Sequence, residues 1–169
     1  MRKNWYLLLL GFLFLSVSCI VDRDRDSYID NDTIATVYDL RNINFTYTNS
    51  DGWTIYKEFL NPLVGSDMLL IYRMSDTTNN GSPVWQQIPR TLYLSQGELD
   101  YDFDFSRDDI RIMAGGNYDI STTPAFLENQ TFRIVIVPGS TTGTSRMDFS
   151  DYEAVAEHFN LKNVKIQQL

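Results

Sequence analysis

The chain has 169 residues, a formal net charge of −8, one cysteine and one histidine. Its length suits one ordinary domain, because most domains have about 100–200 residues. The single cysteine excludes an internal disulfide and a cysteine cage for zinc, and the single histidine excludes a multi-histidine metal centre. The 22 acidic residues against 14 basic ones argue against nucleic acid as a partner, since phosphate backbones are bound through Lys and Arg.

Residues 1–18 have the layout of a secretory signal peptide. Arg2 and Lys3 supply positive charge, an apolar run spans 5–15, and small residues then lead to Cys19. An apolar core of about 7–15 residues that ends in small residues is typical of such signals. The run is short for a membrane-spanning helix, which needs roughly 20 apolar residues. We therefore predict that residues 1–18 are removed, with an uncleaved anchor as the alternative.

The end of this signal resembles the lipobox of bacterial lipoproteins. Val17 and Ser18 match the two family positions before the cysteine, whereas Ser16 stands where Leu is usual and Leu15 lies one place earlier. In that family the cysteine receives diacylglycerol and becomes the new N-terminus. The resemblance implies a lipid anchor on Cys19, and each buried acyl methylene contributes about 0.8 kcal/mol to attachment. An ordinary signal peptide with a chance cysteine is the alternative.

Residues 19–34 are predicted to form a solvated acidic tether, because the segment has too few apolar residues to bury. It is similar to the surface-export signal of some Gram-negative outer-membrane lipoproteins. The residue after Cys19 is Ile20 rather than the Asp associated with inner-membrane retention. These features favour the outer membrane and leave open whether the protein faces the periplasm or the cell surface.

The same tether carries a possible calcium motif. Asp22, Asp24, Asp26 and Asp30 occupy positions 1, 3, 5 and 9 of a D-x-D-x-D-x-x-x-D loop. Alternate carboxylates of this kind can converge on a hard cation. The loop has Ser at position 6 and Thr at position 12, where calcium loops have Gly and a bidentate Glu. A plain spacer is therefore the competing interpretation.

The remaining chain, 35–169, alternates apolar and polar residues as β-strands do. Strands 43–48 and 53–59 flank an Asn-Ser-Asp-Gly turn and predict an antiparallel hairpin. The nearly continuous apolar run 67–74 predicts a central strand buried on both sides. Residues 84–94 predict two short strands that are interrupted at Pro89.

Further along the chain, strand 99–105 has apolar residues on one face and Asp100, Asp102 and Asp104 on the other. Strands are also expected at 109–113, 131–137 and 164–166. A capping box that starts at Ser150 predicts one short helix ending near residue 160. The predicted fold is all-β, an antiparallel β-sandwich of about eight strands with one short C-terminal helix.

Four blocks of this domain resemble a family of Gram-negative cell-envelope lipoproteins without an assigned activity. Those proteins have a lipobox, a variable and sometimes collagen-like linker, and a β-rich domain of about this size. This chain lacks the collagen-like tract, and the family supplies no functional residues to carry over. The resemblance implies placement in the cell envelope. The blocks are 67–74, 84–93, 101–105 and 132–139.

The sequence offers weak signals for chemistry. The carboxylates at 100, 102 and 104 have the spacing of a glycosidase pair, but every strand with a polar outer face produces this spacing. His158 lies on the predicted helix, and no G-x-S-x-G motif accompanies it. Tyr56 and Trp85 are candidate ligand-binding residues, because the first lies opposite the Trp53 face and the second borders a polar loop. No catalytic residue and no cofactor are predicted.

These observations predict a membrane-anchored lipoprotein of the cell envelope. Its β-sandwich would be a non-catalytic binding or structural module, with an envelope protein or a glycan as a possible partner besides the membrane. Two alternatives remain. The protein could be a surface accessory protein that binds or processes glycans, or a calcium-stabilised adhesion module.

Overall fold

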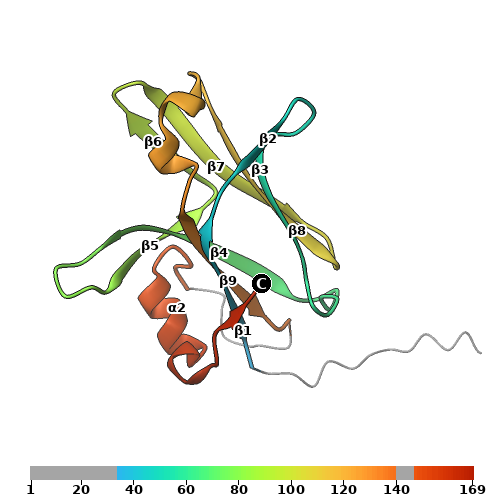
Figure 1. The fold of residues 1–169 in the computed structure, drawn as a ribbon. Coiled ribbons are helices and arrows are strands. Elements are labelled where there is room, and N and C mark those ends of the chain that lie inside the picture. The colour runs from blue at the N-terminus through green and yellow to red at the C-terminus, as the bar shows by residue number, and fades with distance from the viewer. Residues whose placement is uncertain (1–33, 140–146) are drawn as a thin grey trace, which may run out of the picture.

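The computed structural model describes residues 34–139 and 147–169, and it confirms the all-β sandwich with one short α-helix (Figure 1). Two five-stranded sheets pack together, and each neighbouring pair of strands is antiparallel except β1 and β10. The first sheet has the order β10 (Gln167–Gln168), β1 (Thr36–Ile43), β9 (Gln130–Val137), β4 (Met68–Thr77) and β5 (Pro83–Ile88). The second sheet has the order β2 (Thr46–Thr48), β3 (Gly52–Glu58), β8 (Asp109–Gly116), β7 (Gly97–Phe105) and β6 (Arg90–Leu94).

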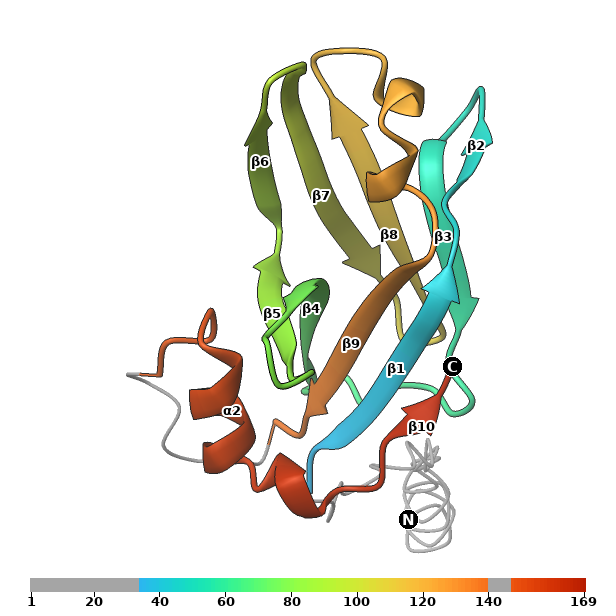
Figure 2. The ribbon, with the colours of Figure 1, turned by 60° about the vertical axis from the view of Figure 1, so that its left-hand side comes forward.

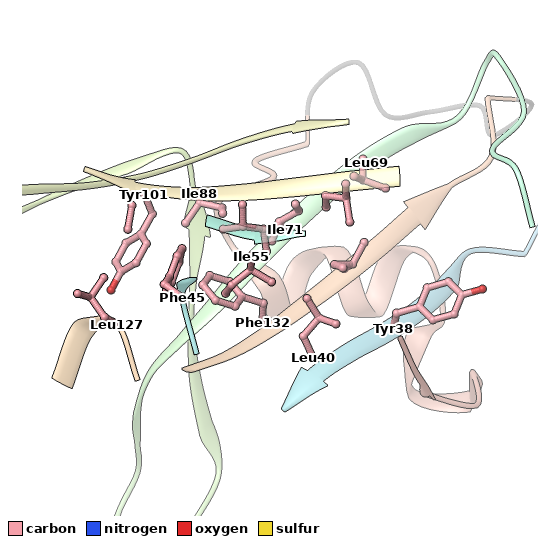
Figure 3. Close-up of a cluster of buried hydrophobic side chains, with 14 of the residues drawn as sticks. Tyr38, Leu40, Phe45, Ile55, Leu69, Ile71, Ile88, Tyr101, Leu127 and Phe132 are labelled. Carbon is pink, nitrogen blue, oxygen red and sulfur yellow. The ribbon is translucent and has the colours of Figure 1, made fainter. Parts of the chain in front are cut away.

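The main core lies between the two sheets and takes alternate residues from their longer strands. In β4 the inward residues are Leu69 and Ile71, and in β8 they are Ile110 and Ile112. Aromatic rings fill one end of this core, where the ring of Phe132 lies 6.0 Å from that of Phe45 and 6.2 Å from that of Tyr101 (Figure 3). Each fully buried side chain of this kind contributes about 1.5–3 kcal/mol relative to an exposed one. The strict alternation of the sequence thus becomes one continuous inter-sheet layer.

The chain passes from one sheet to the other four times, after β1, β3, β5 and β8, and two of these crossings are short. β1 leads into β2 through Phe45, whose backbone N–H donates to the carbonyl of Leu127 at 2.8 Å. β5 leads directly into β6 through Pro89, and the bond before this proline is cis. Figure 2 shows β5 and β6 lying end to end along one side of the sandwich. The interruption predicted at Pro89 is therefore the point where the strand changes sheet.

The outer face of the first sheet is covered by α2 (Tyr152–His158). Val155, Ala156 and Phe159 pack on apolar residues of β1, β4 and β9 and form a second buried cluster. The helix is capped by Asp151, whose side chain accepts hydrogen bonds from the N–H groups of Glu153 and Ala154. The predicted capping box at Ser150 was therefore one residue too early. The negative charge of this carboxylate also stabilises the helix, because it lies at the positive end of the helix dipole.

Two other expectations needed correction. The predicted strand 43–48 is divided into the end of β1 and β2, because residue 45 turns inward between the sheets. The last strand is Gln167–Gln168 instead of 164–166, since a 3-10 helix (Leu161–Asn163) takes up more of the chain before it can pair with β1. The predicted hairpin is confirmed by the pairing of β2 with β3.

The outer face of the second sheet is exposed along β7. Asp100, Asp102 and Asp104 are exposed as predicted, whereas Leu99 and Tyr101 on the opposite side of the strand are buried. A row of like charges on a strand discourages association with other sheets. In the described part of the chain, no helix is long and apolar enough to cross a membrane.

Candidate functional site

A surface hollow of about 410 Å³ lies where the chain crosses from β5 to β6. β4 and β5 provide one wall, β6 provides another, and the 3-10 helix Pro124–Phe126 contributes Phe126. Both strands at the crossing are edge strands of their sheets, so the hollow lies at the side of the sandwich. Its lining residues are Arg73, Ser75, Gln86, Arg90, Thr91, Leu92, Tyr93, Leu94 and Phe126.

Arg73 is the most deeply buried charged residue of this lining, with an exposed fraction of 7%. It follows Leu69 and Ile71 on the inward face of β4, so it continues the row of core residues to the end of the sandwich. Gln86 is its partner across the β4–β5 ladder, and the ladder changes register just beyond, at Met74. The position is therefore a core position that carries a guanidinium.

A neutral network holds the Arg73 side chain. Its Nε donates to Oε1 of Gln130 at 2.8 Å. Nε2 of Gln130 in turn donates to the carbonyls of Ala125 and Glu128, at 2.9 and 2.6 Å, which fixes the orientation of the amide. Because the Gln130 side chain is itself 5% exposed, this network is buried and specific.

Two aromatic rings pack on the same guanidinium. Its central carbon lies 4.7 Å from the ring centroid of Tyr101 and 5.7 Å from that of Phe126. Both distances are within the range of cation–π attraction. The Tyr101 hydroxyl donates to the backbone carbonyl of Phe126 at 2.7 Å, and burial raises the pKa of this phenol to about 12. The rings fix the plane of Arg73 and bring no negative charge to it.

The charge of Arg73 has no carboxylate within ion-pair distance in the described residues. Burial lowers the pKa of its guanidinium from the ordinary value, although Arg remains protonated at neutral pH. Burying a charge without an opposite charge lowers the stability of the folded state, because neutral polar groups restore only part of the solvation that water gave to the charge. An anion placed in the hollow would reduce that cost.

The rim of the hollow adds a second arginine and an exposed aromatic ring. Arg90 is exposed, and Tyr93 has an exposed fraction of 80%. The lining has two Arg and no Asp or Glu, whereas the whole chain has a net charge of −8. The hollow is therefore a local positive site in an acidic protein, and such a site attracts anions.

The two aromatic residues that the sequence suggested for ligand binding lie on opposite outer faces of the sandwich. Tyr56, on β3, is 54% exposed and donates to Oδ2 of Asp109 at 2.9 Å, and this hydrogen bond raises the pKa of its phenol. Trp85, on β5, is half-buried between Arg133 and Tyr152 under α2. The structure does not bring these two side chains together, and neither lines the hollow.

The other residues proposed from the sequence have different outcomes. Cys19 and the four candidate calcium ligands lie outside the described residues. Within 34–139 and 147–169, no three His, Cys, Asp or Glu side chains form a group that could hold a metal. The ring of His158 lies 4.8 Å from that of Phe159 on α2. The candidate calcium ligands from the sequence are Asp22, Asp24, Asp26 and Asp30.

Comparison of the chain with protein-family models, curated proteins and solved structures finds no match. The resemblance to envelope lipoproteins therefore stays a prediction. Sequence reasoning missed the hollow, although one signal was available. Arg73 is the only charged residue between Met68 and Ser75 in an otherwise apolar run, in phase with core residues, and such a position calls for a specific partner.

Proposed function

We propose that this chain is a lipid-anchored protein of the bacterial cell envelope whose β-sandwich binds an anionic ligand. The observation that carries the binding function is the buried guanidinium of Arg73 in the hollow between β4, β5 and β6. The lipobox-like sequence before Cys19 supports the anchor. The acidic tether 19–34 then separates the anchor from the first strand at Thr36.

The chemistry of the hollow supports binding rather than catalysis. Its charged groups are Arg73 and Arg90, and guanidinium groups do not exchange protons near neutral pH. General acid–base catalysis needs groups whose pKa lies near the working pH. Ser75 also lines the hollow, but its hydroxyl donates to the carbonyl of Val84 at 3.2 Å, and the lining holds no base to activate it. The lining therefore supplies charge and hydrogen bonds to a ligand that leaves unchanged.

The anchor can be tested with the variant Cys19→Ala in the full chain. Loss of the thiol prevents lipidation, so the variant is expected in the soluble fraction while the parent chain partitions with membranes. The control is Ser18→Ala, which keeps a small residue before the cysteine and is expected to stay with membranes. Membrane partitioning of Cys19→Ala equal to the parent would contradict the anchor.

Binding can be tested without knowing the ligand by measuring thermal unfolding in a panel of anions at constant ionic strength. A ligand that binds only the folded state raises the midpoint with concentration. We expect acetate, phosphate or a larger organic anion to raise the midpoint of the parent chain more than that of Arg73→Met. The matched control, Arg111→Gln, removes an equal charge from the exposed face of β8. Equal responses of all three proteins would contradict the proposed binding site.

A further inference from the structure

We infer that the ligand of this hollow is a sugar acid, with its carboxylate on Arg73 and Arg90 and its hydroxyl groups on the neutral polar lining. This inference rests on the proposed anion-binding function and names the chemistry of the ligand. It depends on three properties of the hollow, which are the donors that remain on Arg73, the type of residues around it, and its volume.

The remaining donors of Arg73 suit a planar carboxylate. Its Nε is engaged by Gln130, and its face is packed by Tyr101. The two terminal nitrogens are then the donors with which the side chain can meet a ligand in the hollow. Two parallel N–H groups at the end of a guanidinium match the two oxygens of a carboxylate, and Arg is favoured wherever such paired recognition occurs. Arg90 is an exposed residue of the same lining and adds a second positive charge to the hollow.

The lining fits a carboxylate better than a phosphate group. Phosphate sites in proteins commonly use backbone N–H groups of a helix N-terminus or of a glycine-rich loop. The hollow has no glycine in its lining, and all of its residues except Phe126 belong to strands. Its donors are therefore side chains rather than backbone N–H groups.

The rest of the lining fits a ligand with several hydroxyl groups. Ser75, Gln86 and Thr91 are neutral polar residues of the same lining. Tyr93 also belongs to the lining and is 80% exposed, so it is accessible to a ligand. The volume of about 410 Å³ lies within the range of small-molecule sites and far exceeds the roughly 30 Å³ that one water occupies. A bare inorganic anion would leave most of this space unused.

The experiment is calorimetric titration of the full chain with glucuronate and with galacturonate, at constant ionic strength. Glucose and galactose test the need for the carboxylate, acetate tests the need for the sugar, and phosphate tests the type of anion. We expect at least one sugar acid to bind and the four reference compounds to bind about tenfold or more weakly, because they lose either the charge-assisted hydrogen bonds or the neutral contacts.

Three variants locate the binding in the hollow. Arg73→Met and Arg90→Gln are each expected to weaken sugar-acid binding by about tenfold or more. Arg111→Gln removes the same charge from the outer face of β8 and is expected to bind like the parent. Because Arg90 is exposed, its variant tests the site even if Arg73→Met fails to fold, and circular dichroism reports the fold of each protein.

The possible failures are distinguishable. Phosphate or acetate that binds as tightly as the sugar acids, with loss in the Arg73 and Arg90 variants, would overturn the sugar-acid assignment and leave the anion site intact. Sugar-acid binding that survives both arginine substitutions would overturn the placement of the ligand in the hollow. If none of the anions binds the parent chain, both the sugar-acid assignment and the anion-binding function fail.

Discussion

Two arginines with little exposed surface lie on neighbouring strands of the first sheet and face opposite ways. Arg133, on β9, points to the side covered by α2, and its side chain is 11% exposed. Arg73, on β4, points into the core between the sheets and is 7% exposed. Each guanidinium packs on two aromatic rings, which for Arg133 belong to Trp85 and Tyr152. The two environments therefore match in their ring contacts.

They differ in charge. Arg133 donates to both carboxylate oxygens of Asp39, at 2.8 and 3.0 Å, and its remaining nitrogen donates to the Tyr152 hydroxyl. Burial acts to lower the pKa of Arg133, but the hydrogen bond and charge of Asp39 outweigh it and raise the pKa. Arg73 bonds to a neutral amide, and burial lowers its pKa. The comparison suggests that Arg133 has a structural role and that Arg73 is available to a ligand.

The largest effect is expected for Asp39→Asn, which removes the negative charge between Arg133 and Arg41. Asp39 is 1% exposed, so the substitution leaves a buried guanidinium without an opposite charge. Breaking a buried ion pair in this way costs about 3–5 kcal/mol of unfolding free energy. Urea unfolding of the purified chain measures the cost. A loss no larger than that of an exposed pair would contradict the structural role of this network.

The same carboxylate predicts a pH dependence. Burial alone would raise the pKa of Asp39, but hydrogen bonds from Arg133 and Arg41 outweigh burial and lower it below the ordinary 3.8. Its contribution to stability is therefore complete above the unfolded-state value and is lost as the pH falls through the lower folded-state value. The stability difference between the parent and Asp39→Asn should be full near pH 6 and shrink below about pH 4. A difference that stays constant on acidification would contradict this assignment.

A matched substitution at the two arginines tests the comparison itself. Arg133→Met leaves Asp39 buried with only Arg41 as a partner, and we expect a loss of about 3 kcal/mol. Arg73→Met removes an unpaired charge and leaves one amide oxygen of Gln130 without its donor, so we expect a loss of about 1 kcal/mol. Urea unfolding of both variants under identical conditions measures the difference. Equal costs would show that the two arginines do not differ in role.

A smaller effect is expected from a second matched pair. The Tyr72 hydroxyl donates to the carbonyl of Phe149 on the helix side, and that of Tyr101 donates to the carbonyl of Phe126 beside the hollow, both at 2.7 Å. Each Tyr→Phe substitution keeps the ring and removes one hydrogen bond, which costs about 1 kcal/mol. Thermal unfolding should show similar losses for both. Binding of a sugar acid should survive Tyr101→Phe, because the ring remains under Arg73.

The smallest effect is expected for Arg111→Gln. Its side chain is 40% exposed and pairs with Asp104 and Asp51 on the bare outer face of the second sheet. Exposed pairs contribute little because solvent and salt screen them. We expect an unfolding midpoint that does not differ measurably from the parent. A clear loss would mean that this face is more than a solvated surface.

Much of the fold could be predicted, because strands and turns depend on local patterns of apolar, polar and turn-forming residues. The alternation in 99–105 placed the aspartates outside and Leu99 and Tyr101 inside, and the apolar run 67–74 indicated the central strand β4. The turn at 49–52 predicted the hairpin of β2 and β3. Boundaries were less accurate, since Asp151 rather than Ser150 caps the helix and the last strand begins at residue 167. Both of these depend on how the segment packs on β1 and β9.

The candidate site could not be predicted in the same way. Tyr56 and Trp85 were chosen for their chemistry and their neighbours in the chain, but they belong to different sheets and face away from each other. The hollow combines β4, β5 and β6 with Phe126, and it exists because the chain changes sheet at Pro89. No pattern within one strand indicates what lies opposite it in another sheet.

The sequence by itself determined that the two strands β4 and β9 are buried, because each is a nearly continuous apolar run. It did not single out the two arginines that these strands carry. Only the tertiary structure decided which of them is neutralised. The register of β1 against β9 places Asp39 directly beside Arg133, which lies 94 residues away in the chain. On the other face of the sheet, strand pairing places the neutral amide of Gln130 beside Arg73. The charge of Arg73 therefore has no carboxylate partner among the described residues and lies at the hollow. Periodicity is a local property, whereas the partner of a buried charge depends on strand pairing between distant segments.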